Sequence, residues 1–147
     1  MIKYKVEGVK ELEKSLKKLG DVPQKFVTKA AKQGSTILLK KAKQGGWIDR
    51  SGNLRKGIIL KGEKTKLKGK KVYQVTFDTA YNDVFVKVTK TGKRAYYPAS
   101  QEYGFRTRNG GYVPGFHFMK NAVVEKQTEV ERKIIDVMSK AIDKALK

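Results

Sequence analysis

Apolar side chains recur with two different periods along the chain, and each period predicts a different element. Residues 2–6 alternate apolar and polar positions, which predicts a short strand. Residues 9–19 carry an apolar residue at every third or fourth position, which predicts a helix that Gly20 ends. The chain therefore opens as a strand followed by a helix.

A longer helical pattern extends over about residues 23–44. Asp21 is suited to capping this helix and Pro23 to its first turn, and Gly45-Gly46 ends it. The opposite face of this helix is rich in lysine and has no acid. Its predicted apolar face consists of Val27, Ala31, Gly34, Leu38 and Ala42.

The middle of the chain favours short strands. A helical turn around Leu54, with Ser51 as a candidate cap, leads into a strand that begins at Ile58. Residues 72–77, 84–89 and 94–97 are predicted as further strands. The lysine-dense segment 61–71 is predicted as a mobile loop between two of them, and residues 90–93 as a tight turn.

The last third begins with a short helix from Pro98 that Gly104 ends. Residues 105–115 have the glycines and polar residues of an irregular loop. Residues 118–146 are predicted as an amphipathic helix. Its apolar stripe consists of Ala122, Val123, Val130, Ile134, Val137, Met138, Ala141 and Ala145.

This order of elements predicts one α+β domain over residues 1–147. We expect an antiparallel sheet of about four strands, packed against the long helix of the first half and the C-terminal amphipathic helix. A chain of 147 residues can bury one sizeable core.

Charge adds a functional constraint, because the net charge is +20 and unevenly distributed. Residues 22–120 hold twenty-two basic and five acidic side chains, whereas both ends are nearly balanced. Such a surface attracts polyanions, nucleic acid above all, although a solvated lysine surface is the plainer interpretation. With 28 lysines to 6 arginines, delocalised phosphate attraction is favoured over base reading. The candidate DNA-facing residues are Lys64, Lys66, Lys68, Lys70, Lys71, Arg106 and Arg108.

Other features exclude several classes of protein. The chain has no cysteine, so it has neither disulfides nor thiolate metal sites. No apolar run approaches the length of a membrane span, and the N-terminus lacks a signal-peptide core. We therefore expect an intracellular product that does not act at a membrane.

Catalytic chemistry has little support in the sequence. His117 is the only histidine, and between two phenylalanines it is expected to pack or cap. No spacing fits a metal site or a phosphate loop, so we expect no catalytic, metal-binding or cofactor-binding residues, no cofactor and no enzymatic activity. A small basic ribonuclease that uses tyrosine, arginine and His117 is the open alternative. The central acids are scattered as Asp49, Glu63, Asp78, Asp83 and Glu102.

Tyr96, Tyr97, Tyr103, Phe105 and Tyr112 lie near Arg94, Arg106 and Arg108 in the sequence. Such a pattern occurs in platforms that stack single-stranded nucleic acid, and it occurs equally in the core and interfaces of a half-buried sheet. The second interpretation is favoured, since no known RNA-binding module pattern accompanies these residues.

Three blocks in order resemble the neck or tail-completion proteins of long-tailed, lambda-like bacteriophages, also described as minor tail components. The blocks are VEGVKELEKSLKKLG, RSGNLRKGI, and YPASQEYGFRTRNGGYVPGFHFMKNAV. The second is similar to a Thr/Ser-Gly-x-Leu-x-x-x-Ile element. The third is similar to a Glu-aromatic-Gly motif with a glycine-rich loop and Pro-x-x-Phe before the last helix. The matching positions are Ser51, Gly52, Leu54, Ile58, Glu102, Tyr103, Gly104, Pro114, Phe116, Phe118 and Ala122.

The resemblance implies a structural virion protein at the head–tail junction, made in the host cytoplasm and assembled into a ring, commonly a hexamer, around the DNA channel. The implied partners are further copies of this chain, the connector or head-completion protein and the tail-terminator protein. Non-specific contact with double-stranded DNA is a further candidate. A basic nucleic-acid-binding protein or small ribonuclease is the alternative.

The chain departs from the family pattern at Lys120-Asn121, where a proline often precedes the helical alanine, and at Pro98, which favours a helix before the Glu-aromatic-Gly motif. Within this motif we expect Gly104 to adopt a positive φ. We expect Glu102 to hydrogen-bond an arginine or the backbone amides of the glycine loop.

Overall fold

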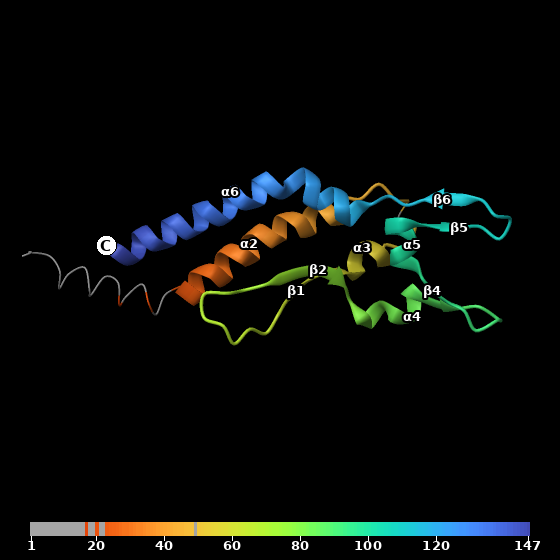
Figure 1. Ribbon diagram of the computed structural model, residues 1–147, viewed down its shortest axis with the longest axis horizontal. Helices are drawn as coiled ribbons and strands as arrows, with labels where there is room; N and C mark the ends of the chain where they lie inside the picture. The colour runs from red at the N-terminus through yellow and green to blue at the C-terminus, as the bar shows by residue number, and fades with distance from the viewer. Residues whose placement is uncertain (1–16, 18–19, 21–22, 49) are drawn as a thin grey trace, which may run out of the picture.

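The computed structural model describes residues 17, 20, 23–48 and 50–147 (Figure 1). The strand predicted at 2–6 and the helix predicted at 9–19, apart from Lys17, lie outside these residues. In chain order the elements are α2 (Pro23–Lys43), α3 (Asn53–Gly57), β1 (Ile58–Gly62), β2 (Tyr73–Phe77), η1 (Thr79–Tyr81), α4 (Asn82–Phe85), β3 (Val86–Val88), β4 (Arg94–Tyr96), α5 (Tyr97–Tyr103), β5 (Gly104–Arg106), β6 (Tyr112–Pro114) and α6 (Phe118–Leu146).

Helices α2 and α6 pack along one another and form the long axis of the molecule (Figure 1). The close approach depends on Gly34, because a Cβ there would lie 2.8 Å from Cγ1 of Ile134 on α6. Lys41 and Glu125 add an ion pair of 2.5 Å across the two helices. The bounds predicted for both helices are confirmed, since each has a long apolar stripe and the two helices pack along one another.

Within the described residues, the strands form three separate antiparallel pairs, β1–β2, β3–β4 and β5–β6. The pair β1–β2 is the longest and packs on α2. The α+β class is confirmed, and in place of about four strands in one sheet the described part of the chain has six strands grouped in pairs. In the sequence, α4 lies between β2 and β3, and α5 lies between β4 and β5.

The core lies where α3, α4, β1 and the first turn of α6 meet. Leu54, Ile58 and Phe85 are among its completely buried side chains. The ring of Phe77 makes edge-to-face contacts with Phe85, Tyr96 and Phe118, at centroid distances between 6.1 and 6.3 Å. This aromatic cluster fixes the start of α6 against β2.

Two predicted boundaries are wrong. Val84 and Phe85 belong to α4, and the strand predicted at 84–89 is only Val86–Val88. An apolar run this short does not distinguish strand from helix. Residues 105–115 form no irregular loop, because the hairpin β5–β6 covers most of them. Hydrogen bonds from Thr107 N to Gly111 O, at 2.8 Å, and from Gly110 N to Thr107 O, at 3.1 Å, close its turn.

The hairpins β3–β4 and β5–β6 project from the same end of the molecule, at the right of Figure 1. The loop between β1 and β2 lies toward the opposite end, beside the start of α2. The elongated subunit therefore has a hairpin end and a lysine-loop end.

Candidate functional site

Glu102 lies at the centre of the third sequence block, on α5, and its side chain is 5% exposed. Its Oε2 accepts a hydrogen bond from Met119 N at 2.9 Å, and its Oε1 accepts one from Lys120 N at 3.1 Å. The expected partners, an arginine or the glycine loop, are wrong. The amides instead belong to the first turn of α6, whose free N–H groups and helix dipole favour a carboxylate.

Backbone bonds reinforce this junction between α5 and α6. Phe116 N donates to Gln101 O at 2.8 Å, and His117 N donates to Glu102 O at 3.1 Å. The two segments therefore join through main chain and side chain together. The hairpin β5–β6 is the loop between them, so its base is held on both sides.

Gly104 has a φ of 82°, which confirms the predicted positive angle. A Cβ at Gly104 would collide with Val113 O, and one at Gly115 would collide with Glu102 O. Both glycines therefore let the two sides of the hairpin base approach more closely than any side chain would allow.

His117 precedes α6 with φ 50° and ψ 35°, the left-handed region that residues other than glycine adopt infrequently. Its side chain is exposed and makes no capping hydrogen bond, so the expected packing between aromatic neighbours is wrong. Glu102 occupies the amides of the second and third helical residues, which an N-cap side chain would otherwise bind.

The second block is mainly structural. Leu54 and Ile58 belong to the buried core, and Gly52, with a φ of 73°, precedes α3. Ser51 Oγ accepts a hydrogen bond from Asn53 N at 3.3 Å, although Gly52 holds the N-cap position. These four predicted residues position the core beneath the hairpins without presenting a reactive group.

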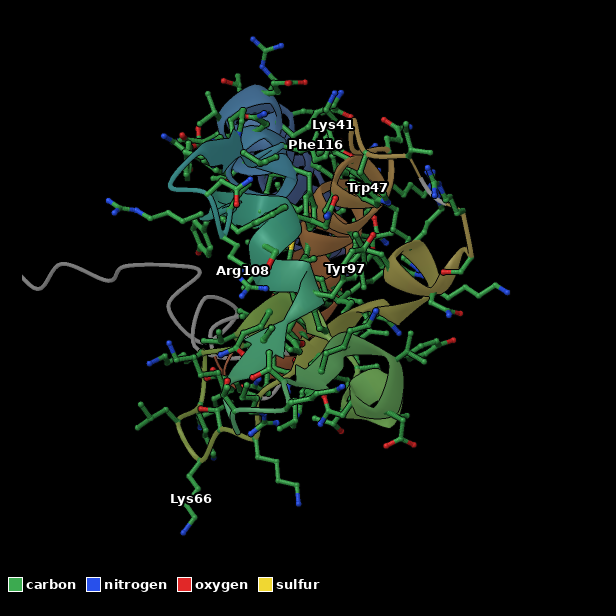
Figure 2. All side chains as sticks on the ribbon, turned by 90° about the vertical axis from the view of Figure 1, so that its right-hand side faces the viewer. Lys41, Trp47, Lys66, Tyr97, Arg108 and Phe116 are labelled. Atoms are coloured by element: carbon green, nitrogen blue, oxygen red, sulfur yellow. The ribbon has the colours of Figure 1, made fainter. Side chains whose placement is uncertain are left out.

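Trp47 packs beside this block and was missed in the sequence. Its ring lies 4.5 Å from that of Phe118, and Arg55 lies 5.6 Å above it. Figure 2 shows Trp47 near Phe116 and Lys41 at the junction of α2 and α6. The sequence around Trp47 does not indicate its contact with Phe118 at the start of α6, because the two residues are far apart along the chain.

The third block divides into a buried and an exposed part. Phe118 is buried, whereas Pro114 and Phe116 are exposed. Tyr103 and Tyr112 are 67% and 61% exposed, and Tyr112 Oη donates to Tyr103 O at 2.6 Å. The hairpin end therefore presents several aromatic side chains to solvent, and the hydrogen bond to Tyr103 O fixes the position of the Tyr112 side chain.

A recess of about 300 Å³ lies between the bases of the two projecting hairpins. We call it the hairpin socket. Its walls come from β3, β4, α5 and β5, so no single stretch of sequence could indicate it. Its lining residues are Lys87, Ala95, Tyr97, Ser100, Gln101 and Phe105.

The candidate DNA-facing residues do not form one patch. Arg106 and Arg108 lie on the hairpin end, whereas Lys64, Lys66, Lys68, Lys70 and Lys71 lie on the β1–β2 loop toward the other end (Figure 1). Gln24 anchors this loop to α2, accepting a hydrogen bond from Gly69 N at 2.8 Å and donating one to Lys70 O at 3.1 Å. The mobility of the loop and its contact with DNA both stay predictions.

Within the described residues, no group of three or more histidines, cysteines or acids is placed to hold a metal ion. No helix in that same part of the chain is both long and apolar enough to cross a membrane.

Residues 10–104 match the model of the HK97-gp10-like family, described as "Bacteriophage HK97-gp10, putative tail-component". This range includes the second block and ends at Gly104 in the Glu-aromatic-Gly motif. Comparisons with curated proteins and with solved structures find no match. The family is a structural one and no enzyme class. Because the match covers well over half of the sequence, the chain belongs to the HK97-gp10-like family of bacteriophage tail components and is a structural protein of the phage tail.

Proposed function

We propose that the chain is a neck or tail-completion subunit that forms a closed ring, commonly a hexamer, at the head–tail junction of the virion. Membership of the tail-component family supports a place in the virion. In the proposed ring, each subunit contacts two neighbours, and the two faces of the ring meet the connector or head-completion protein and the tail-terminator protein.

The exposed aromatic residues of the hairpin end carry this proposal. Tyr103, Phe105, Tyr112 and Phe116 are all exposed, on or beside a hairpin of two three-residue strands. Two-stranded hairpins are only marginally stable alone, and clustered apolar surface of this kind marks interaction sites. Tyrosine, phenylalanine and arginine are also enriched in protein interfaces. A subunit whose hairpin end is completed by a neighbour accounts for these features.

The charge distribution supports a channel for DNA. Most of the net positive charge lies in residues 22–120, and the β1–β2 loop concentrates lysines at the end away from the hairpins. If the hairpin end contacts a neighbour, the lysine loop remains free for another surface. Lysine-rich loops attract phosphates without reading bases, which suits DNA that slides through a ring.

Negative-stain electron microscopy of the concentrated protein tests the ring directly. At about 1 M salt, where the screening length is about 3 Å, we expect closed rings with a central channel. Subunits that stay monomeric at every concentration, yet bind free DNA tightly at physiological salt, would favour the nucleic-acid-binding alternative. Nuclease turnover that is lost in a His117→Gln variant would instead favour the ribonuclease.

A further inference from the structure

The outer side of α6 carries apolar and acidic residues that are largely exposed to solvent. Val124 and Ile135 are 69% and 65% exposed. Glu131 lies between them, seven residues after Val124 and four before Ile135, so the three side chains share one side of the helix. We call this set the α6 ridge.

Glu131 differs from most neighbouring acids because no ion pair with another described residue neutralises its charge. Glu125, Glu129 and Asp136 form ion pairs with Lys41, Lys126 and Lys140, at 2.5, 2.5 and 2.8 Å. Within the described part of the chain, Glu131 forms no ion pair and accepts only a hydrogen bond from Gln127 Nε2, at 3.1 Å. The ridge therefore offers an unpaired carboxylate beside an exposed isoleucine.

The hairpin socket has the complementary properties. Tyr97 and Phe105 give it aromatic walls, and Lys87 is also among its lining residues. Residues 84–120 hold seven lysines and arginines, and their one acid, Glu102, is buried and bonded to α6. Figure 2 looks onto this end of the molecule, with Tyr97 and Arg108 labelled. Residues 84–120 are thus cationic and apolar at their surface, and the exposed acid that precedes them is Asp83 on α4.

Ridge and socket cannot meet within one subunit. Ile135 lies seventeen residues beyond Phe118, or about 25 Å along the helix axis. Helix α6 runs away from the hairpins over its whole length (Figure 1). A contact between ridge and socket therefore requires two copies of the chain.

We propose that the α6 ridge of one copy docks into the hairpin socket of the next, with Ile135 entering between Tyr97 and Phe105 and Glu131 facing Lys87. The proposal rests on the proposed ring and names the surfaces that join its subunits. Because two different surfaces meet, the contact is heterologous, and its repetition generates a ring when the rotation closes.

Charge favours a second copy over DNA as the occupant of the socket. A phosphate backbone would neutralise the cations but leave the aromatic walls uncovered by apolar surface. The ridge supplies both a carboxylate, from Glu131, and an aliphatic side chain, from Ile135. A volume of about 300 Å³ is at the lower limit of roughly 300–1,000 Å³ for ligand pockets and suits protruding side chains.

Cysteine crosslinking tests the contact, because the chain has no cysteine of its own. One protein carries Gln101→Cys in the socket and another carries Ser139→Cys, one turn beyond Ile135. Each is treated alone and as an equimolar mixture with a short bismaleimide at about 1 M salt, where charge repulsion is screened. We expect crosslinked dimer in the mixture and little in either protein alone. The control mixture pairs Gln101→Cys with Thr65→Cys in the lysine loop, and we expect no dimer from it.

Reversing the charges of Glu131 and Lys87 tests whether these two side chains face each other in the crosslinked dimer. In the crosslinking pair, Glu131→Lys on the ridge protein should lower the dimer yield several-fold. Adding Lys87→Glu to the socket protein should restore it, because the pair is then reversed. Both side chains are exposed, so the melting temperatures should stay unchanged and exclude misfolding as the cause.

The outcomes separate this proposal from the ring itself. Rings in the microscope without a crosslink between the Gln101→Cys and Ser139→Cys proteins would overturn the ridge–socket contact and leave the ring standing. Dimer from Gln101→Cys alone would indicate a hairpin-to-hairpin contact and would also overturn it. The ridge–socket contact would also be overturned if double-stranded DNA protects the thiol of the Gln101→Cys protein from modification and a second copy of the chain does not. If neither rings nor any crosslinked oligomer form, the proposed ring fails as well.

Discussion

The carboxylate of Glu102 accepts a hydrogen bond from the backbone amide of Met119 at 2.9 Å and thereby closes the start of the longest helix. Its second oxygen binds the next amide, at Lys120. One side chain thus performs the capping that His117, at the N-cap position, does not perform. The start of α6 consequently depends on a residue that precedes it by a whole hairpin.

Replacing Glu102 by alanine should lower the free energy of unfolding by about 2–4 kcal/mol, because two amides lose a charged acceptor in a buried setting. Glu102→Gln retains one acceptor oxygen and should cost about half as much. Thermal melts of both variants measure the effect. The account is wrong if both variants melt at the temperature of the parent protein.

Gly104 and Gly110 form a matched pair of tests. Both have a positive φ, of 82° and 84°, but only Gly104 has backbone atoms where a Cβ would lie. Gly110→Ala should cost about 1–2 kcal/mol from the left-handed angle alone. Gly104→Ala should cost more than about 3 kcal/mol, since Val113 O must also move. Denaturant unfolding measures both, and equal losses would show that the close approach does not matter.

His117→Asn should raise the free energy of unfolding by up to about 1 kcal/mol. Asparagine tolerates the left-handed angle at this position better than histidine, and the exposed imidazole makes no capping bond to lose. Calorimetry of the variant checks the sign. A clear loss of stability would show that the imidazole has a packing role that its exposure does not reveal.

The β1–β2 loop should be the first site of limited trypsin digestion, because it is exposed and rich in lysine. Gln24→Ala removes the hydrogen bonds to Gly69 and Lys70 and should speed this cleavage several-fold. Gln33→Ala, farther along α2, serves as the control. First cleavage within α2, or no effect of Gln24→Ala, would contradict the anchoring role.

The sequence predicted the structure best where apolar residues recur at regular spacing over a long segment. The stripes of α2 and α6 extend over five or more turns, so Pro23–Lys43 and Phe118–Leu146 appear close to the expected bounds. Gly104 was also predictable, because a glycine after a short helix favours a positive φ.

Features that depend on distant contacts were not predictable. Strands of three residues, such as Gly104–Arg106, are too short to show alternation, so the hairpin β5–β6 was missed. The partners of Glu102 were wrong because the sequence does not show that the hairpin returns the chain to α5. The hairpin socket is assembled from four elements, and only their arrangement in space reveals it.

The central claim is a ring built from strongly cationic subunits. Its most direct test is to measure the oligomeric state at low and at high salt. Because the net charge is +20, we expect monomers or weak oligomers at micromolar concentration in low salt. Light scattering at about 1 M salt should then report one discrete closed oligomer, commonly a hexamer, as repulsion is screened. A protein that remains monomeric at high salt and high concentration would contradict the ring, and a stable hexamer already present at low salt would contradict the role of charge.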